Sequence, residues 1–217
     1  MKEIEAPAAA YNYPREWMLW TAATIGGWVI GSAASYLLAI LLSMLGLGDA
    51  LNADPATVPQ ETVLLLMGAS LLMLFIIGAG VGALQWLVLR RHVMGLQRWA
   101  VFTGLGFALG SFVFLAFMGL GVGLMQWLLL RRDLNKTGWW PVMNALAWPL
   151  GYMFGGSAGM GLGQAFGSPL IANLLSASFT GAIIGAITGV VLLWLLRENA
   201  ALLESLRLER EAEQAQQ

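Results

Sequence analysis

The 217-residue sequence contains no cysteine and only one histidine, His92. Without thiols the chain has no disulfide, no iron–sulfur cluster, no thiolate zinc site and no thiol-linked lipid. Charged residues are scarce, at 11%, and the net charge is -1, so no nucleic-acid partner is expected. Hydrophobic residues make up 59% of the chain, in runs too long for a soluble core to hide. The composition therefore predicts an all-α, polytopic helical membrane protein.

One glycine-rich pattern occurs twice. Residues 78–91 contain Gly78, Gly82, Gln85, Trp86 and a pair of arginines, and residues 119–132 repeat this order. On a helix the two glycines share a face and leave a groove that admits a second backbone. The Trp-to-Arg end is typical of a helix that leaves a membrane on its cytoplasmic side. The pattern predicts packing and orientation, and it holds no nucleophile, acid–base pair or metal-ligand set, so neither an enzyme nor a catalytic or metal site is predicted.

The uncharged stretch 99–130 decides the expected number of membrane segments. One long tilted helix and a tight hairpin with short arms both fit its length. Only the hairpin places all 11 lysines and arginines on one side of the membrane, in accord with the positive-inside rule. We therefore expect six transmembrane segments within 17–196, arranged as three repeated hairpins at about 17–91, 98–132 and 139–197. The cytoplasmic parts are then an N-terminal arm, 1–16, and a tail, 197–217, that continues the last helix.

The first arms of the three hairpins share an aromatic residue, a small polar residue four later, a second aromatic residue four later and then a glycine. The matching sets are Trp20, Thr24, Trp28, Gly31; Trp99, Thr103, Phe107, Gly110; and Trp140, Asn144, Trp148, Gly151. In the third copy Leu192 and Leu193 replace the Gln-Trp pair, so this copy keeps the glycine groove and loses the polar glutamine side chain. Pro141, Pro149 and Gly156 predict a kink in its first arm. The residues expected to pack helices closely are Gly78, Gly82, Gly119, Gly123, Gly151, Gly155, Gly159, Gly163, Gly167, Gly181, Gly185 and Gly189.

Several polar and aromatic groups have two interpretations. Gln85 and Gln126 either bond to a neighbouring helix, which we favour, or bind a quinone, a pigment or a lipid headgroup. His92 lies at the interface rather than on a glycine face, which disfavours axial ligation of a macrocycle. An aromatic belt at the membrane boundary explains most tryptophans: Trp17, Trp20, Trp86, Trp99, Trp127, Trp139, Trp140 and Trp194. The candidate lipid or ligand contacts are Gln85, Trp86, Arg90, Arg91, His92, Gln126, Trp127, Arg131 and Arg132.

Ionisable residues are missing from the interiors of the six expected segments. Such residues mark proton relays and ion pathways, so an ion-coupled transporter is disfavoured. Asp49, Asn52 and Asp54 lie in a turn-rich loop, but their spacing matches no EF-hand, and a solvated loop explains them.

The repeated Gly-x-x-x-Gly-x-x-Gln-Trp-x-x-Leu-Arg-Arg unit, followed by a Trp-rich arm, resembles a group of uncharacterised multi-spanning proteins of cyanobacteria and other phototrophic bacteria. The resemblance covers about residues 17–197 and implies a membrane fold but no activity. We expect a protein of the bacterial inner or thylakoid membrane with both termini cytoplasmic and a structural or assembly role. Its expected partners are lipids and copies of itself or a larger membrane complex. No cofactor is predicted, although bound lipid is expected. The alternative is a passive channel or a subunit that holds lipid, quinone or pigment.

Overall fold

The computed structural model describes residues 12–48, 57–93, 95–111 and 118–215, and these ranges contain helices but no strand. The predicted all-α class is therefore confirmed for the described part of the chain. The N-terminal arm up to residue 11 and the loop residues Asp49, Asn52 and Asp54 lie outside it. In chain order the helices are α1 (Tyr13–Leu42), η1 (Ser43–Leu47), α3 (Gln60–Leu89), α4 (Trp99–Ser111), α5 (Met118–Leu130), α6 (Trp139–Leu150), η4 (Gly151–Gly156), α7 (Ser157–Ala165), α8 (Pro169–Glu198) and α9 (Ala200–Ala215).

Three helical stretches are long and apolar enough to cross a membrane. They are Tyr13–Leu47, Gln60–Leu89 and Pro169–Glu198. A helix of 30 residues, such as α3, is about 45 Å long, which exceeds a hydrocarbon core of about 30 Å. The described structure is thus compatible with a membrane protein.

Residues 99–130 do not form one continuous helix. α4 ends at Ser111, α5 begins at Met118, and the two helices pack on each other. Their backbones meet at Gly106, where an added Cβ would lie 2.6 Å from the Cα of Val122. Each helix has 13 residues and is about 20 Å long. The alternative of a single tilted span is therefore wrong.

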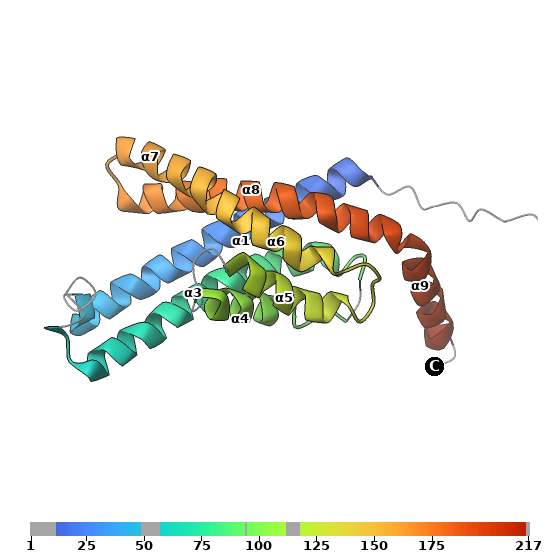
Figure 1. The fold of residues 1–217 in the computed structure, drawn as a ribbon, viewed down its shortest axis with the longest axis horizontal. Coiled ribbons are helices and arrows are strands. Elements are labelled where there is room, and N and C mark those ends of the chain that lie inside the picture. The colour runs from blue at the N-terminus through green and yellow to red at the C-terminus, as the bar shows by residue number, and fades with distance from the viewer. Residues whose placement is uncertain (1–11, 49–56, 94, 112–117, 216–217) are drawn as a thin grey trace, which may run out of the picture.

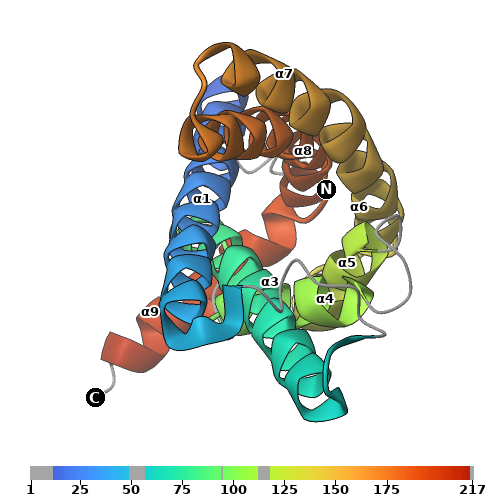
Figure 2. The same cartoon turned by 90° about the vertical axis from the view of Figure 1, so that its left-hand side faces the viewer.

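Six of the helices form a closed ring in which each packs on the one before it and the one after it. Its order is α1, α3, α4, α5, α6 and α8, and α8 returns to α1 (Figure 2). η4 and α7 continue the direction of α6 and lie along α8. At one end of the molecule the α1–α3 pair and the α7–α8 pair diverge (Figure 1).

Two buried clusters fill the ring. The first contains Trp20, Leu89, Trp99, Leu130, Trp140 and Leu196, and the second contains Trp28, Val81, Phe107, Val122, Trp148 and Ile184. Arg90, Arg131 and Arg197 directly follow Leu89, Leu130 and Leu196 in the chain. Because those leucines share one cluster, these arginines lie at the same end of the molecule, which we call the basic end.

Where the sequence predicts a kink in the first arm of the third copy, the structure has a π-helical segment. α6 gives way to η4 at Gly151, two residues after Pro149. Proline has no N–H to donate and its ring clashes with the preceding turn, so the hydrogen-bond ladder is disturbed there.

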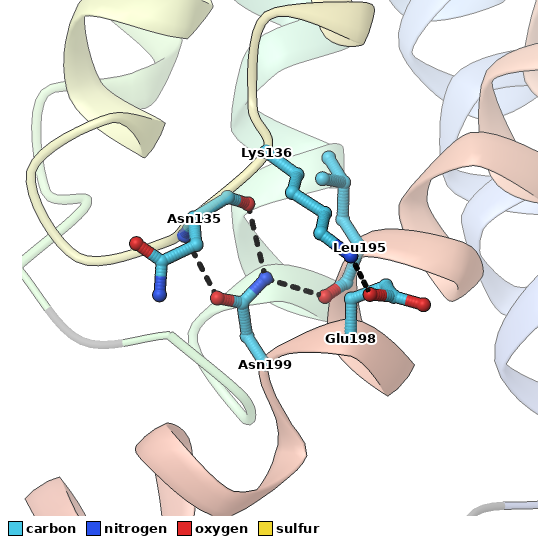
Figure 3. A network of polar contacts seen from close by, with 5 residues as sticks. All are labelled: Asn135, Lys136, Leu195, Glu198 and Asn199. Carbon is cyan, nitrogen blue, oxygen red and sulfur yellow. Dashed lines mark hydrogen bonds and ion pairs between the residues drawn. The ribbon is translucent and has the colours of Figure 1, made fainter.

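The last long apolar helix, α8, does not continue into the tail, contrary to the sequence-based expectation. α8 ends at Glu198, and Asn199 has non-helical angles of φ -109° and ψ 13°. Its side-chain oxygen accepts from the backbone N–H of Asn135 at 2.7 Å, and its Nδ2 donates to the carbonyls of Asn135 and Leu195 at 3.2 and 2.8 Å (Figure 3). These bonds tie the end of α8 to the turn before α6. α9 therefore starts in a new direction (Figure 1).

Candidate functional site: a buried tryptophan and glutamine network

Three tryptophans from three different helices meet inside the basic end of the ring. Trp20 of α1, Trp99 of α4 and Trp140 of α6 are 0%, 0% and 1% exposed. The rings of Trp20 and Trp140 are 5.9 Å apart, edge to face, and those of Trp99 and Trp140 are 6.2 Å apart. Such pairs add about 0.5–1.5 kcal/mol beyond area burial, so the three indoles hold α1, α4 and α6 together.

Each of these indoles donates its N–H to a helix next to its own in the ring. Trp99 Nε1 donates to Gln85 Oε1 on α3 at 3.3 Å, and Trp140 Nε1 donates to Gln126 Oε1 on α5 at 2.9 Å. Trp20 Nε1 donates to Thr188 Oγ1 on α8 at 3.0 Å, which joins the first and last long helices. The same bond therefore recurs at three junctions around the ring.

The two glutamines extend these junctions into a continuous network. Gln85 Nε2 donates to Thr24 Oγ1 at 3.1 Å, and Gln126 Nε2 donates to Thr103 Oγ1 at 2.9 Å and to Gln85 Oε1 at 3.3 Å. Each of the two threonines donates in turn to the carbonyl oxygen of the tryptophan four residues before it. A buried polar group without a partner costs about 1–3 kcal/mol, so a complete set of bonds is needed at this depth.

The third junction uses a different residue for the same purpose. Leu192 stands where the other copies have glutamine, and the acceptor is Thr188, one helical turn earlier on the same face of α8. The Gln-Trp pair is absent from this copy, as the sequence shows, and Thr188 supplies an acceptor in place of the glutamine. The sequence feature that could have revealed this acceptor is a threonine four residues before Leu192, because residues four apart on a helix share a face.

A second layer of aromatic side chains lies farther from the basic end along the ring axis. The ring of Trp28 is 5.6 Å from Phe107, 5.5 Å from Trp148 and 5.6 Å from Tyr152. Trp148 Nε1 donates to Asn144 Oδ1 at 3.2 Å. Within the described ranges, Trp28 Nε1 and Thr21 Oγ1 are buried without a hydrogen-bond partner. The interior of the ring is thus occupied by side chains at both levels.

The aromatic belt predicted from the sequence is wrong for Trp20, Trp99 and Trp140, which lie in the protein interior. Their positions near helix ends fit either a belt or an interior cluster, and only the packing of the helices separates the two. Trp139 is 59% exposed and remains on the surface. Trp86 and Trp127 are partly buried, and the guanidinium carbons of Arg90 and Arg131 lie 5.1 and 4.7 Å from their ring centroids.

The glycines lie where helices approach each other closely. Gly78 and Gly82 of α3 face α4, Gly119 and Gly123 of α5 face α6, and Gly181, Gly185 and Gly189 of α8 face α1. Gly151, Gly155, Gly159 and Gly163 all face α8. Gly167 differs, because it lies in the turn after α7 with φ +62° and has no neighbour within 4 Å of an added Cβ. Its expected packing role is therefore wrong, since the chain reverses there instead of packing.

The remaining candidate contacts divide into interior and surface groups. Gln85 and Gln126 are 4% and 1% exposed, so their amides bond to helices and do not reach lipid. Arg90, Arg91, Arg131 and Arg132 are exposed. His92 Nε2 lies 3.0 Å from Glu16 Oε2 and connects the turn after α3 to the start of α1.

The buried polar side chains in the described ranges are hydroxyls and amides, and none is charged. Those ranges also contain no group of three or more His, Cys, Asp or Glu that could hold a metal ion. Comparison of the chain with protein-family models, with curated proteins and with solved structures finds no match. The geometry on its own supports a network that joins helices.

Proposed function

We propose that this chain is a multi-pass membrane protein with a structural or assembly role, acting as an accessory subunit of a larger membrane complex or by association with its own copies. The single observation that carries the proposal is the closed ring whose buried polar groups bond mainly to one another. The network joins α1, α3, α4, α5, α6 and α8. Side chains arranged in this way hold a scaffold rigid and leave its outer surface for lipids and partners.

The proposed topology has three hairpins and six membrane segments. The hairpins are α1 with α3, α4 with α5, and α6 to α7 with α8. The recurrence of one indole bond at three junctions supports this division. The common basic end supports an orientation in which both termini are cytoplasmic, in the inner or thylakoid membrane of a bacterium.

The outer surface supports a lipid environment for these segments. Large apolar side chains are exposed on several helices, for example Ile30 at 58%, Leu37 at 61%, Met153 at 64% and Phe154 at 61%. Exposed apolar side chains this large and this numerous are not typical of a soluble protein, whose exposed apolar residues are scattered singly. Lipid tails cover such side chains at no cost.

The packing of the ring favours the structural role over a passive channel. A path along the ring axis would have to pass Trp20, Trp99 and Trp140 and then Trp28 and Trp148, all of which are buried against one another. No pigment or quinone contact is needed to explain the positions of Gln85 and Gln126.

Two measurements test the proposal. Single cysteines introduced at His92, Lys136 and Asn52 of this cysteine-free chain are labelled with a membrane-impermeant reagent in intact cells and in inverted vesicles. We expect the first two to react only in inverted vesicles and the third only in intact cells. Labelling at Lys136 in intact cells would refute the six-segment topology.

The assembly role is tested by gentle extraction, followed by mass and absorbance analysis of the particle. We expect a particle heavier than one chain, containing copies or a fixed partner and no stoichiometric pigment. A monomer that carries a stoichiometric chromophore would instead favour the ligand-holding class.

A further inference from the structure

Two arginine-bearing turns lie side by side at the basic end. Arg90 and Arg91 directly follow α3, and Arg131 and Arg132 directly follow α5. Gly95 of the first turn is close to Asp133 of the second, since an added Cβ at Gly95 would lie 3.8 Å from Asp133 Oδ2. Val93, Leu96 and Leu134 from the two turns enter one buried cluster beneath them. We call residues 90–93, 95–98 and 131–134 the twin arginine turns, and they lie against each other.

These turns carry an excess of exposed positive charge. Arg90, Arg91, Arg98, Arg131 and Arg132 are all exposed, and Asp133 is the only acidic residue in the two segments. The ion pairs among the described residues join His92 to Glu16, Lys136 to Glu198 and Arg207 to Glu204 and Glu211. None of these pairs neutralises an arginine of the twin turns, so among the described residues the positive charge of these arginines has no ion-pair partner.

Two of the arginines are also held in a fixed place. Arg90 lies over the Trp86 ring and Arg131 over the Trp127 ring, at 5.1 and 4.7 Å from the centroids. Trp86 and Trp127 are only partly buried, which suits headgroup depth, and an arginine stacked on the face of such a ring keeps outward N–H donors free. Both turns repeat this arrangement.

The end of α8 lacks these features, although the sequence aligns it with the other two. Leu193 stands at the position of Trp86 and Trp127, and Arg197 is followed by Glu198, which pairs with Lys136 (Figure 3). The basic end is therefore not uniformly cationic. Within the described ranges, the paired arginines with a guanidinium stacked on a tryptophan follow α3 and α5, not α8.

We propose that the twin arginine turns bind the phosphate headgroups of anionic phospholipids in the cytoplasmic leaflet. The inference rests on the membrane orientation proposed above and adds to it a ligand class and a location. A guanidinium group forms two parallel hydrogen bonds with a phosphate, and basic residues near a membrane surface each strengthen binding of anionic lipid about fivefold. Bound lipid of this kind would orient the protein and fix its depth.

The test uses the full chain in vesicles made of equal parts of phosphatidylcholine and phosphatidylglycerol. After mild extraction, mass spectrometry gives the ratio of the two lipids retained by the protein. We expect enrichment of phosphatidylglycerol in the native chain. Replacement of Arg91 and Arg132 by glutamine should lower that enrichment about twenty-fivefold, as two contributions of about fivefold each. Both tryptophan contacts remain in this variant, which protects its fold.

The matched control replaces Arg15 and Arg197 by glutamine. These residues are also exposed basic groups, so the control removes the same charge from other parts of the chain. It should retain phosphatidylglycerol as the native chain does. An equal loss in the two double variants would show that only net charge matters, and would overturn the assignment to the twin turns.

Inorganic phosphate added to the detergent-solubilised protein distinguishes a lipid from a free anion. If phosphate at millimolar concentration displaces phosphatidylglycerol, the site is one for a free anion and the lipid proposal fails. A chain that enters vesicles but retains the two lipids equally also refutes it, while leaving the proposed membrane role intact. Failure to enter vesicles contradicts the proposed function itself.

Discussion

Replacing Gln126 by leucine tests whether the buried network stabilises the ring. Gln126 is 1% exposed, and its side chain accepts from Trp140 and donates to Thr103 and Gln85. Leucine has nearly the same volume as glutamine, so the packing changes little. It has no polar atom in its side chain, so the hydrogen bonds are lost. Thr103 and Gln85 keep other partners, whereas the Trp140 N–H loses its acceptor. We expect a loss of about 1–3 kcal/mol in the free energy of unfolding.

The measurement is thermal unfolding of the detergent-solubilised protein, followed by tryptophan fluorescence. For a chain of this size each kcal/mol lowers the Tm by about 2–4 °C. Gln164→Leu is the matched control, because Gln164 is an exposed helical glutamine of α7. It should leave the Tm unchanged. Equal Tm values for the two variants would refute the reasoning.

A second experiment copies the threonine acceptor found at the third junction. Val122 precedes Gln126 by four residues, as Thr188 precedes Leu192, and Val122 is 1% exposed. Combining Val122→Thr with Gln126→Leu should give Trp140 a hydroxyl acceptor, like the one that Trp20 has at 3.0 Å. We expect the double variant to recover at least half of the lost Tm. A double variant no more stable than Gln126→Leu would show that the three junctions are not equivalent.

Two further substitutions test other contacts. Gly159→Ala should destabilise the chain by about 1–3 kcal/mol through overpacking, because the new Cβ would lie 2.3 Å from the Cα of Ser176. Gly161→Ala is the control and should not destabilise the chain, because nothing lies within 4 Å of a Cβ added there. Since α8 closes this face within one chain, size-exclusion chromatography should give the same oligomeric state for both; dissociation by Gly159→Ala would place the contact between chains. Asn199→Ala should speed amide hydrogen exchange at Asn135, because its backbone loses the partners seen in Figure 3, and unchanged exchange would contradict that role.

The sequence by itself determined the helical class and the faces along which helices approach. Long apolar runs need internal backbone hydrogen bonds in a membrane, and only helices supply these within one segment. Glycines four residues apart mark a smooth face whatever lies opposite, so Gly78, Gly82, Gly119 and Gly123 could be identified without knowing their partners. The lack of charge within the apolar stretches was equally readable.

Only the tertiary structure decided which helix lies on which face. Periodicity shows that Trp20 and Thr24 share a face, but it does not say whether lipid or protein covers that face. A tryptophan near a helix end suits the membrane boundary and the interior equally, because its ring is apolar and its N–H needs one acceptor. Thr188 supplies such an acceptor only because ring closure brings α8 beside α1, a contact between residues 168 positions apart. Asn199 likewise ends α8 through bonds to Asn135, which no local pattern could reveal.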